Sequence, residues 1–247
     1  MPYEPRFYRD SVQTEELVSF SVIDSETDLF ISAISNLSTE AGAAVRACRG
    51  DIEAFIASTP KFAESLEPYD VPETAPEIVK QMAAAGQAAG VGPMAAVAGA
   101  VAEFVGRALM LKSPDIIVEN GGDIFMAATV PRRLSVYAGS SPLSNKISVV
   151  IKSDMTQLGI CTSSGTVGHS VSFGRADAAV VMSPDTALAD AWATRIGNMV
   201  SGPADLDKAL AVSRNASDLT GVLIVVGDKL AVWGNVELQP VFDKLKE

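Results

Sequence analysis

Two apolar segments joined by a pair of glycines constrain the fold of this chain more than any other feature. The first segment, 115-DIIV-118, is typical of a buried strand. It continues into 119-ENGGDIF-125, where Gly121 and Gly122 can adopt the positive φ angles of a tight turn. A second apolar segment follows directly after this turn. We therefore expect an antiparallel hairpin over residues 115–130.

The rest of the chain alternates strand and helix signals. The strand signals are segments dense in β-branched and aromatic residues, and the helix signals are apolar residues spaced three and four apart. Proline marks the boundaries, as at Pro60, which ends a helical pattern, and at Pro93, where a first helical turn is expected. Residues 159–174, dense in Gly, Ser and Thr, are expected to form a loop. The other expected elements are two strands within 17–33 around a turn at 24–26, helices at 38–59, 78–88 and 93–110, strands at 134–138, 146–151 and 177–182, a helix from its cap Ser183 to about Val200, a short helix at 206–212, and a hairpin over 222–233 that turns at Gly227-Asp228.

This order of elements predicts an α+β fold in which antiparallel sheets pack with helices. The 247 residues suffice for one large domain. No obvious flexible linker interrupts the chain. We therefore expect a single domain over residues 1–247, built from two intertwined, related halves at about 1–110 and 111–247.

Charge and composition exclude several classes of protein. The net charge is −11, and no basic run is longer than Arg132-Arg133, so a nucleic-acid-binding stripe is missing. Two cysteines, Cys48 and Cys161, make no disulfide framework. The amino terminus lacks the apolar core of a signal peptide, and the longest apolar stretch, 94–105, contains Glu103 and is too short to cross a bilayer. We expect a cytoplasmic protein with neither nucleic-acid nor membrane partners.

The double-glycine turn is the first candidate for a binding site. Glycines with positive φ can expose clustered N–H groups, which make an anion-binding concavity. Asp123 could then meet a metal, a hydroxyl group or a base edge. The simpler interpretation, which the turn alone does not exclude, is a hairpin tip with polar residues.

The segment 186-TALADAWATRIGN-198 is the second candidate. On a helix, Asp190 and Thr194 are four residues apart and share a face, with Ala187 and Gly197 adding little bulk to it. A carboxylate and a hydroxyl are hard oxygen ligands that suit Mg²⁺. The simpler alternative is a solvated Asp190 and a Thr194 hydroxyl bonded back to a helix carbonyl.

Two further segments carry weaker signals. The segment 161-CTSSGTVGHS-170 contains the only histidine, His169, near Cys161 and Ser163, which permits a nucleophile with a histidine base. The alternative is a Ser/Gly loop that lines a ligand. The segment 90-GVGPM-94 opens a helix whose N-terminus could attract phosphate.

In order along the chain, these motifs resemble the ApbE family, the FAD:protein FMN transferases. Members carry a Gly-rich entry to a helix, a strand that ends in N-x-G-G-D, a Ser-Gly loop, and a helix with A-D-A-x-x-T. This chain has 89-AGVGPMAAVAGAVAE-103, 120-NGGDI-124, 163-SSG-165 and 189-ADAWAT-194, and the spacing of the last three also fits. The match covers roughly residues 78 to 200.

The resemblance implies a duplicated T-fold-like architecture with the active site between the halves. It also implies bound FAD or FMN, and a Mg²⁺ ion held by Asp190, Thr194 and a backbone carbonyl, which acts as a Lewis acid while FMN is transferred to a protein threonine or serine. This chain is shorter than usual family members and has no export signal. It also lacks the family's H-I-I-D-P-x-T-G segment, and 91-VGPM-94 replaces the A-K-G motif with its lysine. It therefore resembles a shorter, cytoplasmic branch of the family.

We therefore expect a protein that binds a flavin nucleotide or a related phosphorylated ligand with Mg²⁺ and acts as a flavin or nucleotidyl transferase. Two alternatives stay open: a non-catalytic binding module, and a hydrolase that uses Cys161 or Ser163 with His169. The Ala/Gly-rich helix and the apolar strands leave room for a homodimer. The candidate site residues are His169 as acid or base and Asp190 for catalysis, Asp190 and Thr194 for the metal, and Gly92, Asn120, Gly121, Gly122, Asp123, Ser163, Ser164 and Gly165 for the cofactor.

Overall fold

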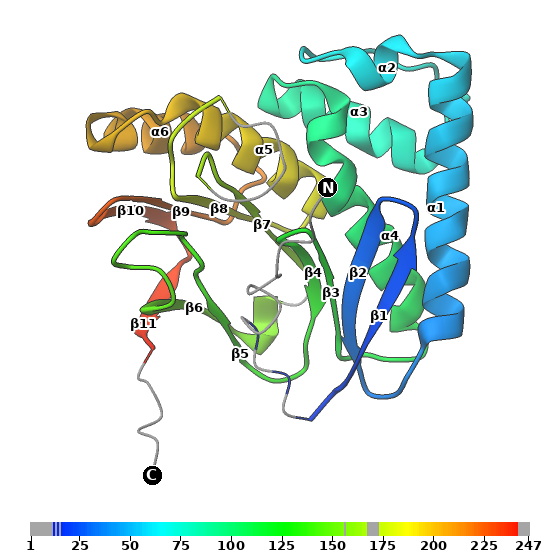
Figure 1. Ribbon diagram of the computed structural model, residues 1–247, viewed down its shortest axis with the longest axis horizontal. Helices are drawn as coiled ribbons and strands as arrows, with labels where there is room; N and C mark the ends of the chain where they lie inside the picture. Colours follow the sequence, from blue (N-terminus) through cyan, green and yellow to red (C-terminus); the bar gives the residue numbers. More distant parts are fainter. Residues whose placement is uncertain (1–11, 13, 15, 156, 167–172, 242–247) are drawn as a thin grey trace.

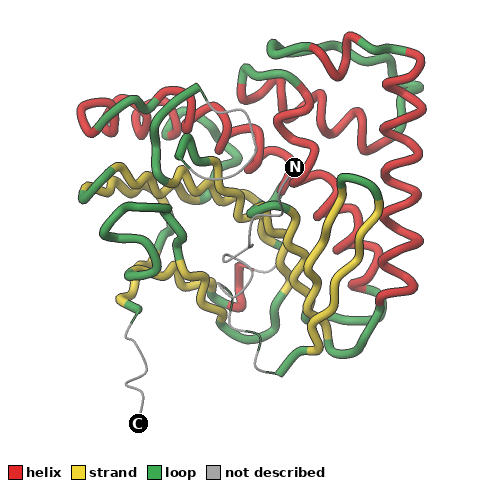
Figure 2. The backbone as a smooth tube through the Cα atoms, in the orientation of Figure 1, coloured by secondary structure: helices red, strands yellow, loops and turns green. Residues whose placement is uncertain are grey.

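The computed structural model describes residues 12, 14, 16–155, 157–166 and 173–241. Within these residues, eight strands form one antiparallel sheet and three more form a smaller sheet. Helices cover one face of the large sheet, and the small sheet lies against the other face (Figures 1 and 2). The expected α+β arrangement is confirmed. The large sheet contains, in spatial order, β1 (Val18–Asp24), β2 (Thr27–Ala33), β3 (Ile116–Asn120), β4 (Asp123–Ala127), β7 (Leu158–Ser163), β8 (Ala178–Ser183), β9 (Gly221–Val226) and β10 (Lys229–Gly234), and the small sheet contains β11 (Glu237–Pro240), β6 (Ile147–Ile151) and β5 (Arg132–Ser135).

The two covered faces explain why the central strands are apolar without interruption. In β3, Ile116 and Val118 belong to the core beneath the helices, whereas Ile117 belongs to the core beneath the small sheet. Successive side chains of a strand point to opposite faces, so a strand that is buried on both sides has no polar positions to alternate. The expected hairpin is confirmed, because β3 and β4 pair from Ile116–Ala127 to Asn120–Asp123.

Helix α4 is the central helix of the helical layer. It contacts β3 and β4 on one side and α1 and α5 on others. A side chain at Gly106 would place its Cβ 2.1 Å from the Phe125 ring, so glycine is what lets α4 approach the sheet. By length and composition residues 93–110 could span a membrane, yet here the segment is a largely buried core helix. The helices are α1 (Ser38–Ser58), α2 (Lys61–Glu64), α3 (Glu77–Ala89), α4 (Val97–Met110), α5 (Thr186–Met199) and α6 (Leu206–Ser213), with 3₁₀ turns at Pro93–Ala96, Ser153–Met155 and Pro203–Asp205.

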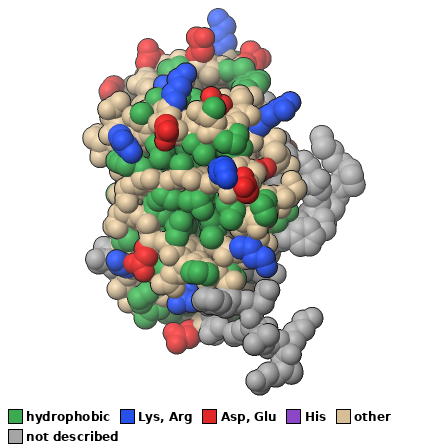
Figure 3. Space-filling model, turned by 90° about the vertical axis from the view of Figure 1, so that its left-hand side faces the viewer, with side chains coloured by type: hydrophobic (Ala, Val, Ile, Leu, Met, Phe, Trp, Pro, Cys, Tyr) green, Lys and Arg blue, Asp and Glu red, His purple; other side chains and the backbone are tan. Residues whose placement is uncertain are grey.

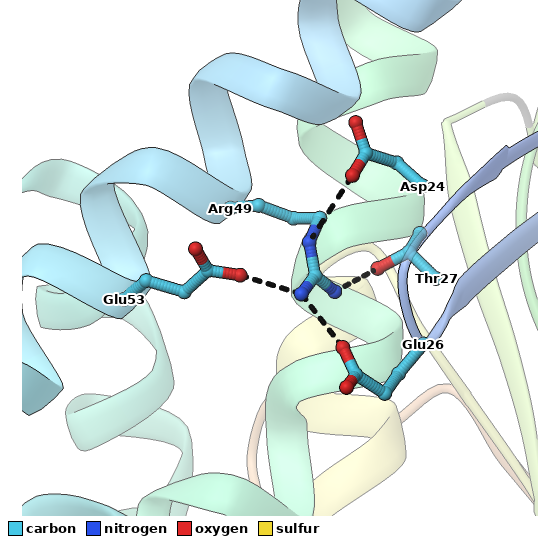
Figure 4. Close-up of polar contacts among 5 residues, drawn as sticks. All are labelled: Asp24, Glu26, Thr27, Arg49 and Glu53. Carbon is cyan, nitrogen blue, oxygen red and sulfur yellow. Dashed lines mark hydrogen bonds and ion pairs between the residues drawn. The ribbon is translucent and has the colours of Figure 1, made fainter.

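An arginine joins the first hairpin to α1 (Figure 4). The Arg49 guanidinium of α1 donates to Glu26 Oε2 at 2.7 Å, in the turn between β1 and β2, and to Thr27 Oγ1 at 2.9 Å, at the start of β2. The same group pairs with Glu53 one helical turn later and lies 3.8 Å from Asp24 Oδ1. The expected polar turn at residues 24–26 is therefore present, and its side chains hold the hairpin against the helix.

Several sequence-based expectations differ from the structure. The expected loop at 159–174 was wrong for its first five residues, which lie in β7 between β4 and β8. The strand was not predicted because the segment is rich in Gly, Ser and Thr, which are typical of loops. Ser183 is not the cap of α5 but the last residue of β8, and Asp185 caps the helix by accepting a hydrogen bond from the Leu188 N–H at 2.9 Å. The helix after Pro93 begins with a 3₁₀ turn, so α4 itself starts at Val97.

The order of elements is similar on either side of the β4–β7 pair. Up to β4, the chain forms the hairpin β1–β2, then helices, then the hairpin β3–β4. From β7 on, it forms the pair β7–β8, then α5 and α6, then the hairpin β9–β10. This order is what two related halves would produce, and the division of the domain into such halves stays a prediction.

Candidate functional site

The turn between β3 and β4 is built by its two glycines. Gly121 has a φ of 67° and Gly122 a φ of 105°, both in the region that favours glycine. The Gly122 N–H donates to Glu119 Oε1 at 2.8 Å, so it is satisfied inside the turn and is not free to bind an anion, contrary to the sequence-based expectation. A Cβ at Gly121 would meet no atom within 4 Å, and Gly121 is exposed. The turn therefore has an open outer side and a carboxylate on its inner side.

Asn120 ties the same turn to helix α4. Its amide Nδ2 donates to the Ala98 carbonyl at 3.1 Å, in the first turn of α4. On the other side of the turn, Asp123 Oδ1 accepts from the Thr162 N–H of β7 at 3.3 Å. The two polar residues that flank the glycines are thus both held by the protein. Their remaining atoms are what could meet a ligand.

Asp190 reaches the same turn of α4 from helix α5. Its Oδ2 accepts a hydrogen bond from the Gly99 N–H at 2.8 Å. Helix α4 has no side-chain cap of its own at Ala96, so Asp190 serves as a cap supplied by another helix. A Cβ at Gly99 would lie 2.5 Å from the Thr186 carbonyl oxygen and 2.8 Å from Asp190 Cβ. Glycine at position 99 is what allows α4 and α5 to come this close.

The structure therefore brings Asp190 and Asp123 together, although 67 residues separate them in the chain. Both side chains are buried, at 8% and 7% exposure. Burial raises the pKa of Asp123 well above its usual range, and the charge of Asp190 raises it further. Burial likewise raises the pKa of Asp190 to about 7, against the opposing effect of hydrogen bonds from the Gly99 and Ala98 N–H groups. Two neighbouring buried carboxylates are a strong electrostatic reason for a cation or a shared proton.

Cys161 lies on β7, close to both of these carboxylates. It is fully buried, and its Sγ donates to the Thr186 carbonyl at 3.4 Å. Burial raises the pKa of its thiol well above the usual range, and the charges of Asp123 and Asp190 raise it further. A nucleophilic cysteine needs a lowered pKa and access to substrate, so this site opposes the hydrolase alternative for Cys161. His169, its expected partner, lies outside the described residues.

The remaining candidate residues extend the site along β7 and α5. Thr194 follows Asp190 by one helical turn and is half-buried. Ser163 is the last residue of β7 and pairs with Ala179 of β8. Ser164 and Gly165 begin the return toward β8, where the Gly165 N–H donates to the Ala176 carbonyl at 2.9 Å. Ser163, Ser164 and Gly165 therefore lie at the carboxyl end of β7, and α5, which carries Thr194, packs against this strand.

Gly92 is explained by packing without any ligand. It is buried, and a Cβ there would lie 1.9 Å from the Ser65 carbonyl oxygen. The space in front of its α-carbon is therefore filled by the connector after α2. Its expected role in cofactor binding stays a prediction.

Sequence reasoning missed three residues that shape the site. Glu119 had no expected role, yet it closes the glycine turn. Gly99 was only one of many small residues in an apolar helix. Glu103, a lone carboxylate within that helix, is fully buried and was noted only as an argument against a membrane span. A single charged residue on an otherwise apolar helix was the signal that could have identified it.

The donor set fits Mg²⁺ together with a phosphorylated ligand. Within the described residues, no group of three or more His, Cys, Asp or Glu side chains is arranged to hold a metal ion. Asp190 and Thr194, with Asp123 close by, offer hard oxygen atoms, and the repulsion between the two carboxylates would be relieved by a cation. Mg²⁺ commonly takes one or two protein carboxylates and completes its shell with water and phosphate oxygens.

Comparisons with known proteins show the family to which this chain is similar. The family model described as AbpE bacteria matches residues 9–236. A UPF0280 protein from Methanocella arvoryzae is 44% identical over 189 residues, which are 76% of this chain and 77% of the relative. A UPF0280 protein from Methanothrix thermoacetophila is 46% identical over 190 residues, 76% of this chain and 79% of the relative.

Solved structures share the fold at low sequence identity. The flavin transferase ApbE from Vibrio cholerae superposes with a TM-score of 0.59 at 15% identity, over 88% of this chain and 96% of that one. The ApbE protein from Thermotoga maritima gives a TM-score of 0.54 at 12% identity, over 87% of this chain and 96% of that one. At such identities the likeness concerns the fold.

Proposed function

The chain belongs to the family that the AbpE bacteria model describes, and on that premise we propose that it binds a flavin nucleotide, FAD or FMN, with Mg²⁺, and transfers the FMN part of FAD to an acceptor. The ligand would lie between the β3–β4 turn, the end of β7 and helix α5.

One observation carries the proposal. The motifs 120-NGGD-123 and 189-ADAWAT-194 both converge on the first turn of α4: Asn120 donates to the Ala98 carbonyl, and Asp190 accepts from the Gly99 N–H. If the hairpin turn and the face of α5 each served only its own local structure, nothing would require both to contact the same turn of α4. Their meeting, together with the buried Asp123–Asp190 pair, is what a cation and a diphosphate would require.

Each residue of this site would have a separate task. Asp190 and Thr194 would hold the cation, while the hydrogen bond from Gly99 fixes which carboxylate oxygen remains available. Asn120 and Asp123 would face the ligand beside the exposed Gly121, and Ser163, Ser164 and Gly165 would line it from β7. Bound Mg²⁺ would supply Lewis-acid stabilisation of the negative charge on the diphosphate. In a transfer, a P–O bond of the FAD diphosphate breaks, AMP leaves, and the acceptor hydroxyl loses its proton as it joins the FMN phosphorus. His169 would be the base that takes this proton.

Isothermal titration calorimetry with FAD, in the presence and absence of Mg²⁺, tests the binding step. The wild type should bind FAD more tightly with Mg²⁺ than without it. Asp190→Asn should lose this Mg²⁺-dependent gain, because the amide keeps the hydrogen bond to Gly99 but removes the charge that holds the cation. Asp207→Asn, which removes an exposed carboxylate on α6, should behave as wild type. Absence of FAD binding to the wild type would refute the proposal.

A second candidate function is a flavin-binding protein without transfer chemistry. The missing A-K-G lysine and the missing H-I-I-D-P-x-T-G segment favour it. Incubation of the wild type with FAD, Mg²⁺ and a threonine-containing acceptor protein separates the two. AMP release with flavin attached to the acceptor supports transfer, and FAD binding with no AMP release supports the non-catalytic module.

A further inference from the structure

Glu103 is a buried carboxylate that the proposed chemistry does not use. It lies in the middle of α4 with no exposed surface. Its Oε2 accepts from the Thr186 N–H at 2.6 Å and from Gln81 Nε2 at 3.2 Å, and its other oxygen forms an ion pair with Arg107. Burying a carboxylate is costly unless its partners compensate, so its position in a helix–helix contact requires a reason.

The contact of Glu103 with α5 mirrors the contact of Asp190 with α4. Thr186 is the first residue of α5, and its N–H donates to a carboxylate of α4. Gly99 lies in the first turn of α4, and its N–H donates to a carboxylate of α5. In each helix the acceptor carboxylate follows the donor N–H by four residues, which places both on one face. Each helix therefore caps the beginning of the other.

Two hydrogen bonds about one helical turn apart fix both the rotation and the translation of α5 on α4. A shift of α5 by one residue along its axis, about 1.5 Å, would break both bonds. The close contact of Gly99 with the Thr186 carbonyl leaves little space for any other alignment. The alignment matters for the site, because Asp190 and Thr194 follow Thr186 by one and two helical turns.

Formation of α5 does not by itself require Glu103. Asp185 is the side-chain cap of this helix and accepts from the Leu188 N–H at 2.9 Å. Gln81 donates to Asp185 as well as to Glu103, at 3.0 Å, and so joins the two carboxylates. A helix with its own cap gains little initiation from a second acceptor, so the distinctive effect of Glu103 is on where the helix sits.

We propose that Glu103 is a positioning residue that aligns helix α5 so that one oxygen of Asp190 caps α4 and the other is available to a cation. The part of this inference that concerns the cation rests on the proposed function, whereas the alignment of α5 does not. Glu103 touches neither the ligand nor the cation, and acts through the Thr186 N–H.

The alignment can be tested without any ligand by NMR of the ¹⁵N-labelled protein. In Glu103→Ala, the Gly99 amide should lose its hydrogen-bonded proton shift and exchange with solvent about tenfold faster or more, although the Glu103 side chain does not bond the Gly99 N–H. Glu103→Gln should resemble wild type, because its side-chain oxygen can still accept from the Thr186 N–H. Ile52→Ala, which opens a cavity in α1, lowers stability elsewhere and should leave the Gly99 amide shift unchanged.

The consequence for the site is tested by titrating Mg²⁺ into the same variants. Loss of an outer-shell partner commonly weakens metal binding by about 10–100-fold, so Glu103→Ala should weaken Mg²⁺ by at least tenfold. It should change FAD binding without Mg²⁺ by less than about twofold, and Glu103→Gln should restore Mg²⁺ affinity. Unchanged Gly99 shifts and Mg²⁺ affinity in Glu103→Ala, equal losses in Ile52→Ala, or failure of Glu103→Gln to restore them would each overturn the inference. If the wild type binds neither Mg²⁺ nor FAD, the proposed function fails, and the Gly99 amide still decides the alignment.

Discussion

The raised pKa of Asp190 predicts that Asp190→Asn stabilises the ligand-free protein at alkaline pH. The pKa of this carboxyl is about 7 in the folded protein and 3.8 as an ordinary value. Between these values the folded protein keeps a proton that the unfolded chain has released, so stability falls as pH rises from about 4 to about 7. A difference of about three pKa units, at about 1.4 kcal/mol for each, corresponds to about 4 kcal/mol.

Asparagine carries no charge and can still accept a hydrogen bond from the Gly99 N–H. The fall in stability with rising pH should therefore be absent in Asp190→Asn. The stability advantage of Asp190→Asn over wild type should therefore grow by about 2–3 kcal/mol between pH 5 and pH 8. Urea unfolding, followed by fluorescence of the buried Trp192 on α5, measures it at both pH values, with Asp207→Asn as the control. A difference between variant and wild type that does not change with pH would refute the reasoning.

Three other predictions follow from single contacts. Gly99→Ala should lower the free energy of unfolding, measured in urea, by about 1–3 kcal/mol, because its Cβ would clash with the Thr186 carbonyl. Gly121→Ala should lower it by only about 1 kcal/mol, which is the cost of its positive φ. Equal losses in the two variants would contradict the close helix contact. Cys161 should resist iodoacetamide in the native protein and react only after unfolding, as measured by mass spectrometry, and rapid native labelling would contradict its burial and raised pKa. Arg49→Met should lower stability by about 1 kcal/mol at low salt and by less at high salt, because the network it loses is partly exposed, and an effect independent of salt would contradict an electrostatic role.

Local patterns were sufficient to predict most of the elements. Helix α1 follows from apolar residues at regular spacing and from Pro60, and the β3–β4 hairpin follows from the double glycine. Strand β7 could not be predicted in this way. Its Gly159 is small because Thr186 of α5 approaches it, and its Cys161 is buried by the same helix. Small residues let a helix pack closely on a strand, and small residues are also typical of loops. Composition alone therefore could not distinguish this strand from a loop.

The site could be predicted only in part, because its electrostatics depend on distances that no pattern contains. The motifs identified Asp123 and Asp190, but the raised pKa values arise from their meeting in a buried place. The free N–H expected at Gly122 was wrong because the Glu119 side chain folds back onto its own turn and accepts the hydrogen bond. The cap expected at Ser183 was wrong because the strand continues through that residue, and Asp185 takes the role.

A crystal structure of the protein soaked with FAD and Mg²⁺ tests the central claim most directly. The account predicts diphosphate density between residues 120–123 and helix α5, with a cation bound to Asp190 and Thr194. Flavin density elsewhere on the molecule, or a cation that leaves Asp190 and Thr194 without a contact, would contradict it.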